Sequence, residues 1–211
     1  MRTLEKLMAS KLLKIKAVKL QPNNPFTWAS GWKSPIYCDN RKTLSYPSLR
    51  NFIKLELSRL IREKYQDAEV IAGVATGAIA QGAMVAEELG LPFVYVRSSP
   101  KDHGLENLLE GDLLPGQKVV VIEDLISTGG SSLKAVEAIR NNGGDVVGML
   151  AIFTYSIPAA EKAFKTAKVT LTTLCRYEDV LEESLATKYI TESDLQTLNE
   201  WRKSPSTWAQ I

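Results

Sequence analysis

Residues 119–132 read VVVIEDLISTGGSS, and this segment guides the interpretation of the rest of the chain. Its four leading apolar residues predict a strand that is buried on both faces, as in a parallel sheet. Two acidic residues follow at the carboxyl end of this strand, and a loop rich in glycine and hydroxyl groups then enters a helical pattern. Open α/β sheets bind ligands at this end of their strands. The segment therefore predicts a strand, a ligand-binding turn and a helix.

Short apolar runs and helical patterns alternate on both sides of this segment. Further runs occur at 70–74, 93–96, 146–153 and 169–171. We expect a doubly wound α/β fold, with a mostly parallel sheet of about five strands and helices on both faces. Before this region, Pro47 predicts the start of a helix whose buried stripe is Phe52, Leu55, Leu57, Leu60 and Ile61.

The length and composition indicate a single ordinary globular domain. The chain has 211 residues, of which 45% are hydrophobic and 24% charged. This size fits one domain, and the composition excludes wholesale disorder. We divide residues 1–211 into an N-terminal helix and small hood at 1–45, a core at 66–175, and C-terminal helices at 176–211. We expect the hood to be a separate cap and the C-terminal helices to pack on the outside of the sheet.

Charge and apolar patterning argue against nucleic-acid and membrane partners. The net charge is +2, and no run of like charges reaches five residues. No apolar run approaches the roughly 20 residues that span a bilayer. The only cysteines, Cys38 and Cys175, are far apart in the chain and favour reduced thiols over a disulfide framework. We therefore expect a cytoplasmic protein.

The chemistry of the turn suits a sugar phosphate. A helix N-terminus offers unpaired N–H groups and a partial positive charge, and glycines let the backbone approach a phosphate closely. No lysine follows the glycines, so the turn is not a Walker loop. Glu123 and Asp124 would repel phosphate but accept hydrogen bonds from ribose hydroxyls. A ligand with a 5′-phosphate and free 2′- and 3′-hydroxyls suits both parts of the motif, the glycine-rich turn and the acidic pair. The alternative is a solvated strand end followed by an ordinary connection.

Residues 123–131 resemble the motif by which type I phosphoribosyltransferases bind 5-phosphoribosyl 1-pyrophosphate (PRPP), in the form found in orotate phosphoribosyltransferases. The resemblance spans about residues 20–155. It implies PRPP and orotate as substrates, Mg²⁺ held largely by the substrate with no protein side chain as ligand, and formation of orotidine 5′-monophosphate in pyrimidine biosynthesis. It places PRPP against Glu123, Asp124, Leu125, Ile126, Ser127, Thr128, Gly129, Gly130 and Ser131, and orotate against the hydroxyl of Ser127.

Residues 101–104, Lys-Asp-His-Gly, are similar to the mobile catalytic loop of the same family. The resemblance implies that Lys101 and His103, together with Asp124, are catalytic, and that Arg97, Lys101 and His103 bind PRPP. Cations here would neutralise the charge that develops on the departing pyrophosphate. In the family this loop reaches the partner subunit's site, which implies a homodimer. Taken alone, a single histidine is more often structural, and an arginine at a strand end is usually solvated.

Two further segments match the family. Residues 26–41 resemble its F-x-x-x-S-G-x-x-S-P-x-Y-x-D-x-R hood, which covers the base. Within it, Trp28 and Tyr37 are either lid residues or filling for the core of the hood. Residues 73–78 resemble the loop that holds pyrophosphate through backbone N–H groups. A plain strand-to-helix connection is the alternative.

The sequence also departs from the family. Relatives often carry basic residues where this chain has Ala29, Thr76-Gly77, Ser98 and the segment around Thr154. The number of charge contacts to pyrophosphate and orotate is therefore left open. Three other functions are considered: a phosphoribosyltransferase for a purine or uracil, a non-catalytic PRPP-binding regulator, and a generic nucleotide-binding domain. The hood and the loop favour the orotate enzyme over the first two.

Overall fold

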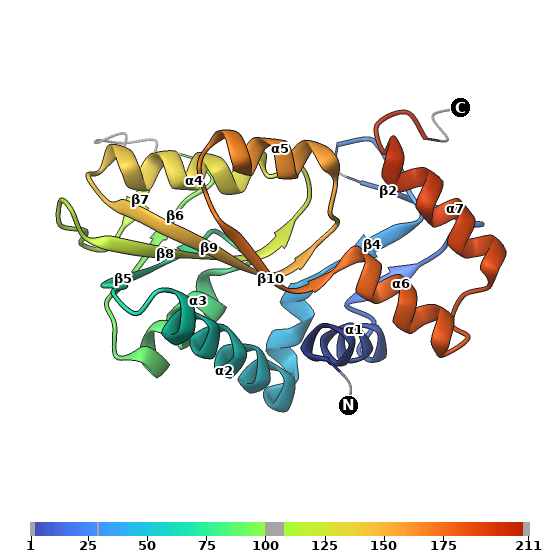
Figure 1. The fold of residues 1–211 in the computed structure, drawn as a ribbon, viewed down its shortest axis with the longest axis horizontal. Helices are drawn as coiled ribbons and strands as arrows, with labels where there is room; N and C mark the ends of the chain where they lie inside the picture. Colours follow the sequence, from blue (N-terminus) through green and yellow to red (C-terminus); the bar gives the residue numbers. More distant parts are fainter. Residues whose placement is uncertain (1–2, 29, 100–107, 209–211) are drawn as a thin grey trace.

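The centre of the protein is a six-stranded sheet. The computed structural model describes residues 3–28, 30–99 and 108–208. The sheet has the strand order β10-β9-β8-β5-β6-β7 (Figure 1). Its strands, in chain order, are β5 (Val70–Val74), β6 (Phe93–Val96), β7 (Leu109–Glu110), β8 (Lys118–Ile126), β9 (Asp145–Thr154) and β10 (Leu171–Arg176).

All five expected strands are present and parallel, which confirms the predicted fold class. They are β5, β6, β8, β9 and β10, and each pairs in parallel with its neighbour among them. The additional strand, β7, is antiparallel to β6 and only two residues long, too short to produce a recognisable pattern. The last strand begins at Leu171, later than the run at 169–171 suggested, and it continues to Arg176.

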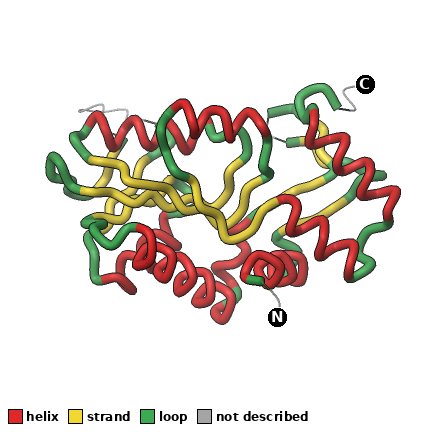
Figure 2. The backbone as a smooth tube through the Cα atoms, in the orientation of Figure 1, coloured by secondary structure: helices red, strands yellow, loops and turns green. Residues whose placement is uncertain are grey.

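Helices cover both faces of the sheet, and Figure 2 shows the strands enclosed between the two helical layers. One layer contains α2 and α3 with α1 beside them, and the other contains α4 and α5 (Figure 1). A separate buried apolar cluster lies on each face. The helices are α1 (Leu4–Lys14), α2 (Pro47–Lys64), α3 (Ile79–Leu89), α4 (Gly130–Asn141), α5 (Pro158–Thr166), α6 (Tyr177–Ala186) and α7 (Glu192–Lys203).

The start of α2 at Pro47 is confirmed, but its buried stripe is only partly as expected. Leu57 is fully buried, whereas Leu55 is 44% exposed. The residues that face the core are spaced four apart, at Leu49, Ile53 and Leu57. Leu55 lies about 200° around the helix from Ile53, so it faces away from the sheet.

The hood is built from two short antiparallel pairs and a 3₁₀ helix. β1 (Val18–Leu20) pairs with β4 (Ile36–Cys38), and β2 (Phe26–Thr27) pairs with β3 (Lys33–Ser34). The 3₁₀ helix η1 (Asn40–Ser45) leads from β4 towards α2. Buried hood residues belong to the same apolar cluster as one face of the sheet. The hood therefore shares its core with the sheet and is not the separate cap that we expected.

The C-terminal helices lie beyond the β10 edge, against α1 and the hood (Figure 1). The fully buried Trp201 of α7 contacts the rings of Trp28, Tyr155 and Tyr177. Its Nε1–H donates to the carbonyl of Lys33 at 3.2 Å. These helices thus lie outside the sheet at its β10 edge, where α6 contacts β10, and the apolar side of α7 in addition packs into an aromatic cluster with the hood. In the described part of the chain, no helix is long and apolar enough to cross a membrane.

Candidate active site

The two acidic residues of the motif lie inside β8. The sequence placed them after the strand, because its apolar run ends at Ile122. Backbone pairing with β9 continues beyond them, through Leu125 opposite Phe153. Polar side chains do not interrupt such a ladder, so the strand extends past the end of the apolar run. Successive side chains of a strand leave it on opposite faces, but the carboxyl groups of Glu123 and Asp124 remain close enough to interact with each other.

Glu123 faces α4 and is 4% exposed. Its Oε2 accepts a hydrogen bond from Ser132 Oγ at 2.8 Å, and its Oε1 accepts from the backbone N–H of Asp124 at 2.9 Å. Ser132 lies in the first turn of α4. Burial, and then the charge of Asp124, raises the pKa of Glu123. This carboxyl group therefore ties the end of β8 to the start of α4.

Asp124 faces the opposite side, where β5 turns into α3. A Cβ added to Gly77 would overlap the Asp124 carboxylate, so the backbone at residue 77 lies directly against this side chain. Burial raises the pKa of Asp124, while a side-chain hydrogen bond with Glu123 and the positive charge of Arg41 oppose that shift. Residues 73–78 do form a strand-to-helix turn, and this turn is next to the acidic pair at the carboxyl edge of the sheet.

The phosphate turn has the backbone features that a bound phosphate requires. Gly129 has a φ of +81° and directly precedes α4. A Cβ there would also come within 2.9 Å of Phe164, so both conformation and space call for glycine. No side chain caps the N-terminus of α4. Its first N–H groups are therefore directed at the turn without a side-chain acceptor, which is the arrangement that favours an anion. Thr128, Gly130 and Ser131 are exposed around them.

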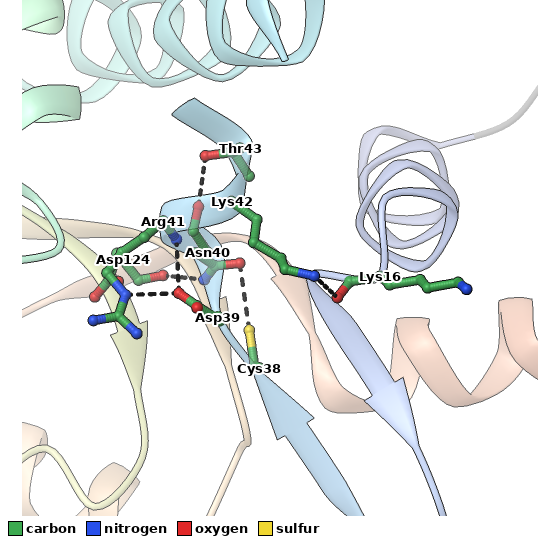
Figure 3. A network of polar contacts seen from close by, with 8 residues as sticks. All are labelled: Lys16, Cys38, Asp39, Asn40, Arg41, Lys42, Thr43 and Asp124. Carbon is green, nitrogen blue, oxygen red and sulfur yellow. Dashed lines mark hydrogen bonds and ion pairs between the residues drawn. The ribbon is translucent and has the colours of Figure 1, made fainter. Parts of the chain in front are cut away.

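The hood reaches Asp124 through η1, as Figure 3 shows. The amide Nδ2 of Asn40 donates to the backbone carbonyl of Asp124 at 2.6 Å. Arg41 Nε binds Asp39 Oδ1 at 2.7 Å, and this hydrogen bond lowers the pKa of Asp39. Asn40 was not predicted as a site residue, because it occupies the unspecified position of the D-x-R element. In the sequence, only its residue type, an amide side chain between the charged residues Asp39 and Arg41, could have indicated a role in the site.

The structure places only part of the predicted catalytic loop. Arg97 directly follows β6, and its backbone N–H donates to the carbonyl of Leu108 at 2.8 Å. Its guanidinium lies 3.6 Å from the Glu110 carboxylate. Lys101 and His103 lie outside the described residues.

The two aromatic candidates for the lid differ in their surroundings. The ring of Trp28 packs against Tyr155, with centroids 4.9 Å apart, and its Nε1–H donates to the carbonyl of Ile36 at 3.1 Å. These contacts favour a structural role for Trp28. Tyr37 is 37% exposed and touches only Phe26 among the ring contacts of the described residues. Of the two, Tyr37 is the side chain with a face available to a ligand. Ser127 is half-buried at the end of β8.

Phosphoribosyltransferases are the class of protein that this sheet and its turns define. A family model described as a phosphoribosyl transferase domain matches residues 50–176. The chain is 72% identical to an orotate phosphoribosyltransferase of Phocaeicola vulgatus, over 99% of this chain and 98% of the relative. The crystal structure of orotate phosphoribosyltransferase from Aeropyrum pernix has a TM-score of 0.75 and 30% identity, over 87% of this chain and 99% of that one.

A third comparison concerns the fold alone. Orotate phosphoribosyltransferase of Mycobacterium tuberculosis in complex with PRPP has a TM-score of 0.64 at 24% identity, over 84% of this chain and 99% of that one. The chain belongs to the phosphoribosyltransferase family and, within it, to the orotate phosphoribosyltransferases.

Proposed function

We propose that the chain transfers the 5-phosphoribosyl group of PRPP to N1 of orotate, giving orotidine 5′-monophosphate and pyrophosphate. The observation that carries this proposal is the meeting of three features at one edge of the sheet. They are the Asp124 carboxylate, the backbone turn at 73–78 and the uncapped start of α4. The names of the close relatives support orotate as the base, rather than a purine or uracil.

The two acidic residues have different roles in this proposal. Asp124, facing the turn at 73–78, accepts hydrogen bonds from the ribose hydroxyls. Glu123 is engaged with Ser132 and holds the start of α4 in position, so that residues 125–131 can bind the 5′-phosphate through backbone N–H groups and hydroxyls. Glu123 thus supports PRPP binding from beneath the turn.

The reaction needs charge stabilisation on the leaving group. The bond between C1′ and the pyrophosphate oxygen breaks as orotate N1 attacks the opposite face, through an oxocarbenium-like transition state. The resemblance assigns Arg97, Lys101 and His103 to the departing pyrophosphate. Preorganised cations at such a position act most strongly when water is excluded. Backbone N–H groups of residues 73–78 are proposed to hold the same group.

Mg²⁺ is expected to be part of the substrate complex. This cation prefers oxygen ligands, and it is usually bound by one or two carboxylates together with substrate phosphates. No group of three potential metal-ligating side chains occurs among residues 3–28, 30–99 and 108–208, so we propose that the substrate itself supplies most of the ligands. When bound, the ion would neutralise negative charge on the pyrophosphate.

A direct assay tests the reaction. Protein, PRPP, Mg²⁺ and orotate are mixed, and the loss of orotate absorbance is followed. Parallel reactions contain uracil or hypoxanthine in place of orotate. Of the three bases, we expect only orotate to be converted. Equal or faster turnover with another base would assign a different acceptor, and binding of PRPP without any transfer would make the protein a regulator.

We also propose a homodimer that shares the loop at 101–104 between subunits. Mixing two impaired variants, Lys101→Ala and Asp124→Asn, tests this arrangement. If the loop serves the partner's site, each mixed dimer has one native site, and about a quarter of wild-type activity returns after random exchange. Recovery of no activity after verified exchange would show that each subunit uses its own loop.

A further inference from the structure

We infer that Asn40 is a positioning residue that couples the base-covering hood to the ribose-binding carboxylate. This inference rests on the proposed function. Its basis is one hydrogen bond between segments 84 residues apart, from Asn40 Nδ2 to the carbonyl of Asp124 at 2.6 Å (Figure 3). Asn40 is 2% exposed, so water does not compete readily for this contact.

The amide of Asn40 is oriented by a second partner. The thiol of Cys38 donates to Asn40 Oδ1 at 3.3 Å, which directs Nδ2 towards Asp124. The backbone carbonyl of Asn40 accepts from Thr43 Oγ1 at 2.6 Å. The backbone carbonyl of Asn40 and both the oxygen and the nitrogen of its side-chain amide are thus hydrogen-bonded, and these bonds hold the side chain in one orientation.

The hood itself is anchored on both sides of Asn40. The N–H of Asp39 donates to the carbonyl of Ala17 at 2.8 Å, in continuation of the pairing between β1 and β4. Lys42 Nζ reaches the carbonyl of Lys16 at 3.2 Å. A movement of the hood is therefore transmitted to Asn40, because the residues on both sides of it are tied to residues 16 and 17, which directly precede β1.

The carbonyl of Asp124, which accepts the hydrogen bond from Asn40, lies beyond the point where β8 stops pairing with β5. β5 pairs with β8 only as far as Ile122. Beyond this pair, Asn40 binds the backbone of β8 at the residue whose side chain faces Gly77. Fixing this carbonyl limits rotation of the Asp124 backbone and thereby the direction of its carboxylate.

The consequence is a thermodynamic linkage between two ligands. A base that orders the hood increases the affinity of the site for the sugar through Asp124. By reciprocity, the sugar increases the affinity for the base by the same factor. Orotate and ribose 5-phosphate form a suitable pair of probes, since they lack the pyrophosphate leaving group and cannot react.

Calorimetry measures this linkage directly. The Kd of orotate is determined with and without saturating ribose 5-phosphate. For the wild type we expect the sugar phosphate to tighten orotate binding about five-fold or more. Asn40→Ala and the isosteric Asn40→Asp, which lacks the donor, should reduce that ratio to near one. Asn40→Asp places a carboxylate against the Asp124 carbonyl, and the resulting repulsion can prevent folding. In that case Asn40→Ala, which introduces no charge, provides the test.

Matched variants separate coupling from stability. Asn142→Ala removes a hydrogen bond of the same kind, from Asn142 Nδ2 to the carbonyl of Ala138 at 2.8 Å, at the C-terminal end of α4 and away from the hood, and it should keep the wild-type ratio even if its melting temperature falls. Cys38→Ser keeps a donor to Asn40 Oδ1 and should also keep the ratio. A wild-type ratio in folded Asn40→Ala overturns the inference, as does a ratio of one in wild-type protein that transfers phosphoribose to orotate. Absence of that transfer in the wild type would instead refute the proposed function.

Discussion

Gly77 and Asp124 occupy complementary space: the carboxylate of Asp124 lies where any side chain at residue 77 would begin. Gly77→Ala should therefore displace the carboxylate and lower kcat/KM for PRPP by up to about 100-fold, since a small misplacement of a positioned group has this effect. Steady-state kinetics measures the loss. Gly90→Ala is the control, because Gly90 has a φ of +67° and open space around it. It should reduce the melting temperature and leave KM for PRPP unchanged. Normal kinetics in Gly77→Ala would contradict the proposed role of Asp124.

Asp124→Asn retains the shape of the side chain and removes its charge. We expect weaker binding of ribose 5-phosphate and of PRPP, because an amide is a poorer acceptor than a carboxylate for the ribose hydroxyls. Calorimetric titration with both ligands gives the change in Kd. Asp145→Asn, at the exposed start of β9, is a matched charge removal far from the turn and should bind as wild type does. Wild-type affinity in Asp124→Asn would exclude a contact between this carboxylate and the ribose.

The burial of Glu123 predicts a pH dependence of stability. Burial and the charge of Asp124 raise its pKa from an ordinary 4.5 to about 8. A group with a raised pKa in the folded state contributes stability that is present below pH 4.5 and is lost as the pH rises to about 8. Glu123→Gln does not ionise, so its melting temperature relative to wild type should increase over this interval. Thermal melts at several pH values measure the difference. A difference that is constant with pH would show that Glu123 titrates normally.

Lys101→Ala tests the loop that the sequence assigns to the leaving group. We expect kcat to fall roughly 100-fold or more, as on removal of one positioned charge-stabilising donor, with a small change in the Kd of PRPP. Turnover assays and calorimetry together distinguish the two effects. An unchanged kcat would remove Lys101 from the proposed mechanism.

Trp201 connects the C-terminal helix to the hood. Trp201→Phe keeps a ring in the aromatic cluster but leaves the carbonyl of Lys33 without its donor, which should destabilise the protein by about 1–3 kcal/mol. Because Lys33 belongs to the hood, KM for orotate should rise more than KM for PRPP. Tyr189→Phe, at a half-exposed site, should change stability by less than about 0.5 kcal/mol. If both KM values in Trp201→Phe equal those of wild type, the helix does not position the hood.

The sequence by itself determined the order of the sheet-forming segments and the place of the ligand turn. Buried parallel strands require continuous apolar runs, and a phosphate turn requires glycine and free N–H groups, so both appear in a local window of the chain. The resemblance to a known family rested on the same local residues at 123–131.

Tertiary structure decided which way each side chain points and which distant segments meet. The sequence treated Glu123 and Asp124 as a pair, and the two do interact, but the continuing β8–β9 ladder gives them different surroundings: Ser132 for Glu123 and the backbone at Gly77 for Asp124. The contact from Asn40 to Asp124 and that from Trp201 to Lys33 join residues that are 84 and 168 positions apart. Such contacts depend on how the hood and α7 pack in space, and no periodicity or motif within a short window encodes that packing.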